Sequence, residues 1–290
     1  MAGLYYIRKE VTVIGAIVGD IIGSRFEGAK SNPKRKKFSL YHKHTRFTDD
    51  TVLTVATCDA ILFDRNYRDV YREYYARYPK VGYGGSFRKW AVSKTKDPYN
   101  SWGNGSAMRV SPIGWAFNTE TTVLEEAEKS AAVTHNHPEG VKGAQAVALA
   151  VFMARTGDTK EAIRKRIEEE FEYDLNPPIT GKFEVSCQGS VPHAIAAFLD
   201  SEGFEDTIRK AIFRGGDSDT IAAIAGSIAE PYYGIPKRIL EEAFDKIPED
   251  LANITELFVK AYKDDQFVKP EKKEHEWKKL FNMLTSKDLL

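Results

Sequence analysis

The stretch TVLTVATCDAILF, residues 51–63, is apolar on nearly every face of a helix. This pattern predicts a helix that is buried on all sides, because it leaves no polar stripe to face water. Residues 141–155 (VKGAQAVALAVFMAR) and 220–230 (TIAAIAGSIAE) are rich in Ala and Gly. Small side chains let helices approach closely, so we expect these two helices to cross in the core.

Outside these stretches, helical periodicity with a charged face predicts amphipathic outer helices at residues 68–77, 159–171, 204–213 and 250–262. The one strand-like stretch is residues 182–187, where Phe183 and Val185 alternate with polar residues. The pattern as a whole therefore predicts an all-α fold.

Two segments are expected to be long loops. Residues 31–46 are polar and basic around KRKK at 34–37, and residues 81–106 carry five glycines and two tryptophans. Long loops in compact domains are more often functional than idle. With no internal repeat or linker, we expect one domain over residues 1–290, with a core of about 12–262 and a C-terminal surface helix at 270–287.

The composition is that of an ordinary globular protein. Of 290 residues, 42% are hydrophobic and 29% charged, and 42 Lys and Arg balance 42 Asp and Glu. Zero net charge gives no general attraction to nucleic acid or to anionic membranes. Only Cys58 and Cys187 are present, too few for a disulfide framework, and the uncharged run 11–19 is too short to span a bilayer. We expect a cytoplasmic monomer without a membrane or stable nucleic-acid partner.

Two short acidic stretches are the sharpest features. FTDDT at 47–51 and GGDSDT at 215–220 each place two carboxylates and hydroxyls at the start of an apolar helix. One interpretation is helix capping, which needs a single side chain per helix. The other is a metal site, since four carboxylates and Thr hydroxyls are the hard oxygen ligands that Mg²⁺, Mn²⁺ or Ca²⁺ prefers. If the two helix starts converge, a pair of metals about 3.5 to 4 Å apart is geometrically natural.

With these motifs, the sequence resembles the ADP-ribosylglycohydrolase family. That family is marked by a G-x-x-x-G-D segment, a T-D-D turn and a late G-G-D-x-D-T turn, found here at 15–20 (GAIVGD), 48–50 and 215–220. The resemblance runs from about residue 15 to about residue 236 and is specific, because three separate motifs occur in the family order. It implies a compact, many-helix orthogonal bundle around a binuclear metal centre.

The resemblance also implies site residues. Two Mg²⁺ or Mn²⁺ ions would be ligated by Thr48, Asp49, Asp50, Asp217, Asp219 and Thr220. Catalysis would use Glu27, Asp50 and Asp217, although a loop Glu is often simply solvated. The SWGNGSAM stretch resembles the family's pyrophosphate loop, so substrate would contact Ser101, Gly103, Asn104, Gly105, Ser106 and Met108.

Two histidines and two aromatic residues could have either a site role or a structural role. His135 matches a His that contacts ribose or phosphate in the family, whereas a His before Pro138 could instead cap a helix; we favour His135 over His137 for the site. Tyr99 and Trp102 could stack on adenine or fill the core.

Two stretches depart from the family pattern. GSRFEG at 23–28 is shorter and more basic than its family counterpart, and residues 185–192 read as a polar turn at the pocket mouth. Cys187 in that turn is interpreted as a buried thiol and not as a nucleophile. These departures leave the substrate open.

The implied reaction is hydrolysis at ribose C1″, which releases ADP-ribose from an ADP-ribosylated protein or small molecule. Two alternatives are a metal-dependent phosphoester hydrolase and a non-catalytic ADP-ribose-binding protein. The group attached to ADP-ribose, the N- or O-glycosidic preference and the choice of Mg²⁺ or Mn²⁺ stay open at this stage.

Overall fold

The computed structural model describes residues 13–28, 33 and 37–262, and within them every regular element is a helix. The helices are α1 Ile14–Gly23, α2 Asp49–Leu62, α3 Tyr67–Arg77, α4 Gly85–Val92, α5 Gly105–Met108, α6 Ser111–Ala116, α7 Glu120–Ala132, α8 Pro138–Thr156, α9 Lys160–Phe171, α10 Cys187–Leu199, α11 Phe204–Arg214, α12 Ser218–Tyr233, α13 Lys237–Phe244 and α14 Glu249–Tyr262. The all-α prediction is confirmed. The helix expected at 270–287 and most of the KRKK run lie outside the described residues.

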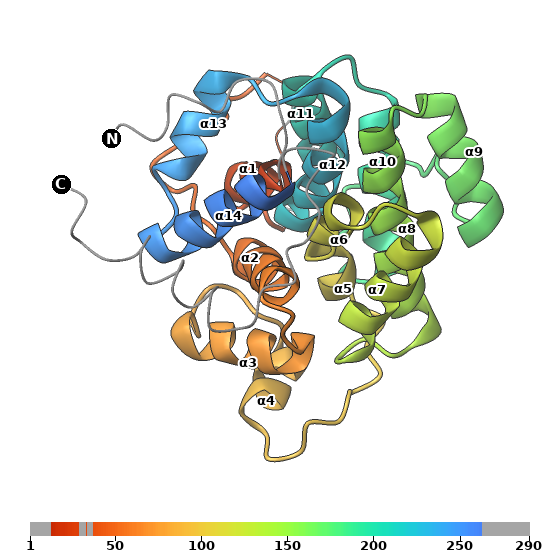
Figure 1. Ribbon diagram of the computed structural model, residues 1–290. Helices are drawn as coiled ribbons and strands as arrows, with labels where there is room; N and C mark the ends of the chain where they lie inside the picture. The colour runs from red at the N-terminus through yellow and green to blue at the C-terminus, as the bar shows by residue number, and fades with distance from the viewer. Residues whose placement is uncertain (1–12, 29–32, 34–36, 263–290) are drawn as a thin grey trace.

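The centre of the bundle is built from apolar helices. All of α1 is buried, α2 is buried from Asp50 to Leu62, and α12 is buried from Ser218 to Glu230. Figure 1 shows α1 and α2 in the middle of the molecule, with α3, α4, α9 and α13 at its periphery. The buried helix predicted from residues 51–63 is therefore confirmed as α2.

The closest helix packing joins α1 to α12. A Cβ added at Gly19 would lie 2.0 Å from the carbonyl oxygen of Ala222, and one at Gly15 would lie 2.2 Å from that of Gly226. The two backbones are thus in direct contact, which only glycine permits. The predicted packing of α8 on α12 is also present, but α12 packs more extensively on α1.

We expect Gly19→Ala to destabilise the protein by about 3 kcal/mol or more, because the new methyl group must push two backbones apart. A matched control is Gly85→Ala in α4, where the nearest atom to an added Cβ is the flexible end of Arg88 at 3.9 Å. That control should change stability by less than about 0.5 kcal/mol. Chemical denaturation measures both, and equal stabilities would contradict the packing described for α1 and α12.

The structure differs from the sequence predictions in three places. Residues 182–187 form no strand: their neighbourhood contains only isolated bridges, Gly103 to Ser186 and Gly181 to Gly215. The alternating pattern arises because Phe183 and Val185 are exposed, 44% and 53%, on an irregular segment. Such a segment lacks a partner strand with which to form a ladder.

The other two differences are helices inside expected loops or turns. The 81–106 loop contains α4, and the expected turn at 185–192 is the start of α10, which is capped by Ser186 and contains Pro192. Their Gly and Pro content concealed the helical period. No helix was predicted for α1, α5, α6, α7 or α13 either.

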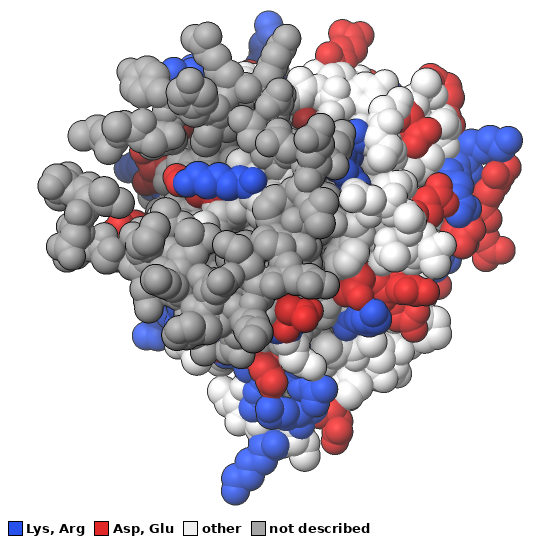
Figure 2. All heavy atoms as spheres, in the orientation of Figure 1, with Lys and Arg blue, Asp and Glu red and all other residues white. Residues whose placement is uncertain are grey.

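On the surface in Figure 2, acidic and basic side chains are intermixed at the edge formed by α9. This helix carries the i,i+4 ion pairs Arg164–Glu168, Lys165–Glu169 and Arg166–Glu170. Within the described part of the chain, no helix is both long and apolar enough to cross a bilayer.

Candidate active site

The two acidic turns lie together at the starts of α2 and α12. After burial, the charge of Asp217 raises the pKa of Asp50, and the charge of Asp50 raises that of Asp219, so carboxylates of the two turns are close together. Glu27 completes the group, because oxygens of its carboxylate and those of Asp217 and Asp219 lie within 4.8 Å of one another. The convergence on which the metal-site interpretation depends is therefore present in the fold.

Asp20, which sequence reasoning did not select, holds the early turn in place. Its fully buried carboxylate accepts hydrogen bonds from the Thr48 backbone N–H at 2.8 Å and hydroxyl at 2.7 Å. It also accepts from the backbone N–H of Thr51 at 3.1 Å and from the Thr51 hydroxyl. The signal in the sequence is an Asp within the otherwise apolar α1. Since α1 also packs on α12, this one helix positions both turns.

The capping interpretation holds for one turn and fails for the other. Thr48 is the N-cap of α2, and its hydroxyl accepts from the backbone N–H of Asp50 at 3.2 Å. Asp217 occupies the N-cap position of α12 but makes no capping bond with its side chain. Its Oδ2 accepts instead from the Asn104 side-chain amide at 2.6 Å. Asp217 is therefore free of a structural capping role.

Burial and mutual repulsion raise the pKa values of the carboxylates in the site. Desolvation raises the pKa of Asp20 to about 6, and desolvation followed by repulsion from Asp20 raises that of Asp49 to about 8. The pKa values of Asp50 and Asp219 are raised well above the ordinary range, first by burial and then by neighbouring carboxylates. A bound cation would offset both effects.

A buried acceptor shows that a cation fits this cluster. Asp50 Oδ1 is inaccessible to solvent and has no hydrogen-bond partner in the described residues. Buried polar atoms in native proteins almost always have a bonding partner. This oxygen can therefore accept a partner from outside the described residues, such as a bound cation. Carboxylate and hydroxyl oxygens suit Mg²⁺ or Mn²⁺.

We expect the metal-free protein to become less stable as the pH rises. The pKa of Asp49 is raised from 3.8 to about 8, mainly by burial, so its protonated form favours the folded state. This contribution is complete below pH 3.8, declines above it and is lost as the pH passes about 8. A cation that binds the ionised carboxylates instead stabilises the folded protein more as the pH rises.

The measurement is the increase in Tm that Mg²⁺ or Mn²⁺ causes relative to a chelator. It is made at two pH values, one near the pKa of Asp20, about 6, and one near the pKa of Asp49, about 8. We expect a larger increase at the higher pH, because metal then displaces fewer protons. An increase that is equal at both values, or larger at the lower one, would show that these carboxylates are not the ligands.

The SWGNGSAM stretch at 101–108, called the glycine loop below, lies beside the late acidic turn at 215–220. Asn104 joins them, since its side-chain amide donates to Asp217 Oδ2 at 2.6 Å and to the Ser190 hydroxyl at 2.9 Å. The buried Met108 accepts a weak hydrogen bond from the Thr220 hydroxyl at 3.9 Å. The Ser106 hydroxyl donates to the Gly140 carbonyl at 2.7 Å, which commits it to holding the loop.

Ser101, Gly103 and Gly105 of this loop are half-buried. The Ser101 hydroxyl accepts from the Gly103 N–H at 3.1 Å. At Gly105 an added Cβ would lie 3.1 Å from His135 Nε2. Side chains at these glycines would crowd the imidazole, so glycine lets the ring of His135 lie directly against the loop.

The two histidines lie in different environments. His135 is 4% exposed, with its ring against the glycine loop and its Nδ1 2.7 Å from the Thr134 hydroxyl. His137 is the N-cap of α8 and accepts from the Glu139 N–H at 3.1 Å. Trp102 is 54% exposed and so does not fill the core.

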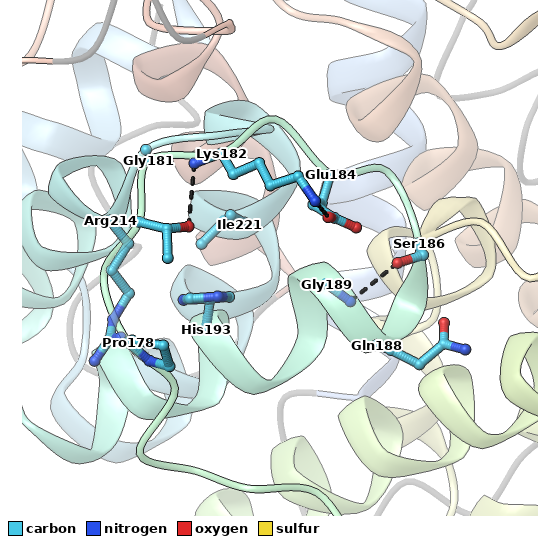
Figure 3. A pocket seen from close by; sticks show the side chains of 12 residues that line it. Pro178, Gly181, Lys182, Glu184, Ser186, Gln188, Gly189, His193, Arg214 and Ile221 are labelled. Atoms are coloured by element: carbon cyan, nitrogen blue, oxygen red, sulfur yellow. Dashed lines mark hydrogen bonds and ion pairs between the residues drawn. The ribbon is translucent and has the colours of Figure 1, made fainter.

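A pocket of about 340 Å³ adjoins the late turn where Gly215 and Ile221 line it. Figure 3 shows His193 in its centre, between Arg214 on one side and Glu184 on the other. Its charges are already paired, Lys182 with Glu184 at 2.7 Å and Arg214 with Asp200 at 3.1 Å. The Lys and Arg side chains that line the pocket are therefore already neutralised by acidic partners.

Cys187 is not a nucleophile. Its side chain is fully buried, and desolvation raises the pKa of its thiol to about 12. A thiol at that pKa is almost entirely protonated at neutral pH, and the thiolate is the reactive form. The interpretation of Cys187 as a buried structural thiol is confirmed.

Comparison with known proteins adds independent findings. The sequence pattern of the ADP-ribosylglycohydrolase domain matches residues 8–266. The chain is 30% identical to ADP-ribosylhydrolase ARH3 of Danio rerio, over 79% of this chain and 83% of that protein. It is 22% identical to the ADP-ribosyl-dinitrogen reductase glycohydrolase of Rhodospirillum rubrum, over 77% and 84% of the two chains.

A solved structure described as an ADP-ribosylglycohydrolase-related protein complex has the same fold. It aligns with a TM-score of 0.70 at 22% identity and covers 86% of this chain and 95% of its own. Together with the sequence matches, this confirms both the resemblance and the prediction of an enzyme. The chain belongs to the ADP-ribosylglycohydrolase family, whose named members are hydrolases that act on glycosidic bonds.

Proposed function

We propose that this protein hydrolyses the glycosidic bond at ribose C1″ and releases ADP-ribose from an ADP-ribosylated protein or small molecule. The observation that carries the proposal is that the two acidic turns lie close together around a buried carboxylate, Asp50, whose Oδ1 lacks a partner among the described residues. Two Mg²⁺ or Mn²⁺ ions held by Thr48, Asp49, Asp50, Asp217, Asp219 and Thr220 would supply Lewis-acid chemistry and orient the ribose hydroxyls.

Glu27 is the proposed general base. It is exposed, unlike Asp217 and Asp219, yet its carboxylate lies within 4.8 Å of theirs. An exposed carboxylate at the edge of the site can receive a proton from water and return it to solvent. The buried carboxylates of Asp50 and Asp217 are proposed to provide the negative charge that stabilises an oxocarbenium-like transition state.

The glycine loop is the proposed site for the diphosphate. Its glycines carry no side chains that would keep an anion from backbone N–H groups, and His135 Nε2 lies against Gly105 and Gly103. Asn104 links this loop to Asp217, so the diphosphate position and the reacting ribose would be fixed relative to each other. Holding a substrate at two points aligns the bond to be broken.

A panel of defined ADP-ribose linkages, including arginine- and serine-linked substrates, tests the proposal. Each is assayed with Mg²⁺, with Mn²⁺ and with chelator, and products are separated by chromatography. Free ADP-ribose that forms only with metal supports the proposal. Inorganic phosphate or AMP as the product would establish a phosphoester hydrolase, and tight ADP-ribose binding without turnover on any linkage would establish a binding protein.

A further inference from the structure

Arg109, directly after α5, is a fully buried cation that no described acidic side chain neutralises. Its Nη2 donates to the Ser130 carbonyl at 2.8 Å and to the Thr134 hydroxyl at 2.9 Å, and its guanidinium lies 4.2 Å from the ring centre of Tyr71. Its Nε and Nη1 have no hydrogen-bond partners among the described residues. Burying such a charge is costly, so a role beyond core packing is expected.

The hydroxyl of Thr134 connects Arg109 to His135. It lies 2.9 Å from Arg109 Nη2 and 2.7 Å from His135 Nδ1, and Thr134 itself is fully buried. A guanidinium can only donate, so the hydroxyl accepts from Arg109 and must place its single proton elsewhere. Nδ1 of His135 is the acceptor within reach.

This network selects one protonation state of the imidazole. If Nδ1 carried a proton, the hydroxyl of Thr134 would receive two hydrogen bonds and its own proton would be buried without an acceptor, which is unfavourable. The doubly protonated ring is opposed by burial and by the charge of Arg109, both of which lower the pKa of His135. The proton is therefore on Nε2.

The Nε2 atom points at the glycine loop. Cβ atoms added at Gly105 and Gly103 would lie 3.1 and 3.6 Å from it, and no hydrogen-bond partner among the described residues reaches it. The neutral ring thus offers one N–H donor at the face of the loop that carries Gly103 and Gly105.

We propose that Arg109 and Thr134 are positioning residues that fix His135 as its Nε2–H tautomer, so that it donates a hydrogen bond to a phosphate oxygen held by the glycine loop. The identity of this anion as the diphosphate of ADP-ribose rests on the proposed function. The tautomer itself does not, because it follows from contacts within the ligand-free chain.

The tautomer is measured in the ligand-free full-length protein by long-range ¹H–¹⁵N correlation NMR with labelled histidine. The protein has 6 His residues, and His135→Gln identifies the signal of His135. We expect Nε2–H in the wild type and in Thr134→Ser, which keeps the hydroxyl. Thr134→Val, of similar shape without a hydroxyl, should shift the ring toward Nδ1–H. A wild-type Nδ1–H tautomer, or no change in Thr134→Val, would overturn the proposal.

Calorimetry with ADP-ribose tests the consequence for binding. Thr134→Val should weaken affinity about tenfold, as expected for one well-placed hydrogen bond, and Thr134→Ser by less than about threefold. His135→Gln carries its own side-chain N–H₂ donor, so adding Thr134→Val to it should cause little further loss. Equal losses in both backgrounds would show that Thr134 acts on the structure and not through His135.

The two proposals fail in different ways. An Nε2–H tautomer that depends on Thr134, in a protein that hydrolyses no ADP-ribose linkage, would refute the proposed function alone. Metal-dependent hydrolysis combined with a Thr134-independent tautomer would refute the positioning role alone.

Discussion

Asp219→Asn is expected to slow ADP-ribose release by more than about 100-fold, since even residues that only support metal ligands change affinity or activity by about 10- to 100-fold. Asp219 is 5% exposed, and its pKa is raised first by this burial and then by the charges of Asp217 and Asp50. An amide of the same shape removes one negative charge from the cluster and one strong oxygen ligand. The effect is measured as kcat/KM with saturating Mg²⁺ or Mn²⁺.

The same substitution should leave the metal-free protein as stable as the wild type or make it more stable, because it relieves repulsion among buried carboxylates. Asp69→Asn is a matched control: Asp69 also lies in the first turn of a helix, but it is exposed and pairs with Lys96 at 2.7 Å. The control should retain full activity. Normal turnover in Asp219→Asn would remove this residue from the mechanism.

Glu27→Gln is expected to reduce kcat by about 10²- to 10⁴-fold, the usual contribution of a general base. Affinity for ADP-ribose should change little, because the diphosphate would contact the glycine loop and not Glu27. The carboxylate is exposed, so the substitution should not disturb folding. Single-turnover rates and a separate calorimetric Kd divide the chemical step from binding.

The control for Glu27→Gln is Glu161→Gln, an exposed Glu in the first turn of α9. It should match the wild type in both kcat and Kd. If Glu27→Gln lowers kcat by less than about threefold, Glu27 is not the general base, and proton transfer must be assigned to another group.

The sequence was sufficient to predict the two acidic turns, but not that they lie close together in the fold. FTDDT and GGDSDT are local patterns, and each lies at the start of a helix as expected. Their convergence depends on contacts between distant residues. Asp20 bonds to Thr48 and Thr51, and Gly19 lies against Ala222. No periodicity of a single helix encodes which other helix it will pack against.

The side chains that hold the site residues in place could not be identified from the sequence either. The amide of Asn104 bonds to Asp217 across 113 positions, and the hydroxyl of Thr134 was one of several polar groups near His135. Helix α10 was mistaken for a turn because Gly189 and Pro192 mask its period, although Ser186 gives it an ordinary N-cap. Local pattern predicts elements, whereas these contacts are set by three-dimensional packing.

Divalent cations are expected to bind between the two acidic turns, at Asp49, Asp50, Asp217 and Asp219. The most direct measurement is anomalous diffraction at the manganese edge from crystals of the full-length protein soaked with Mn²⁺. We predict two peaks about 3.5 to 4 Å apart between the starts of α2 and α12, with Asp50 Oδ1 as a ligand. Peaks elsewhere in the molecule, with none between these two turns, would contradict the account.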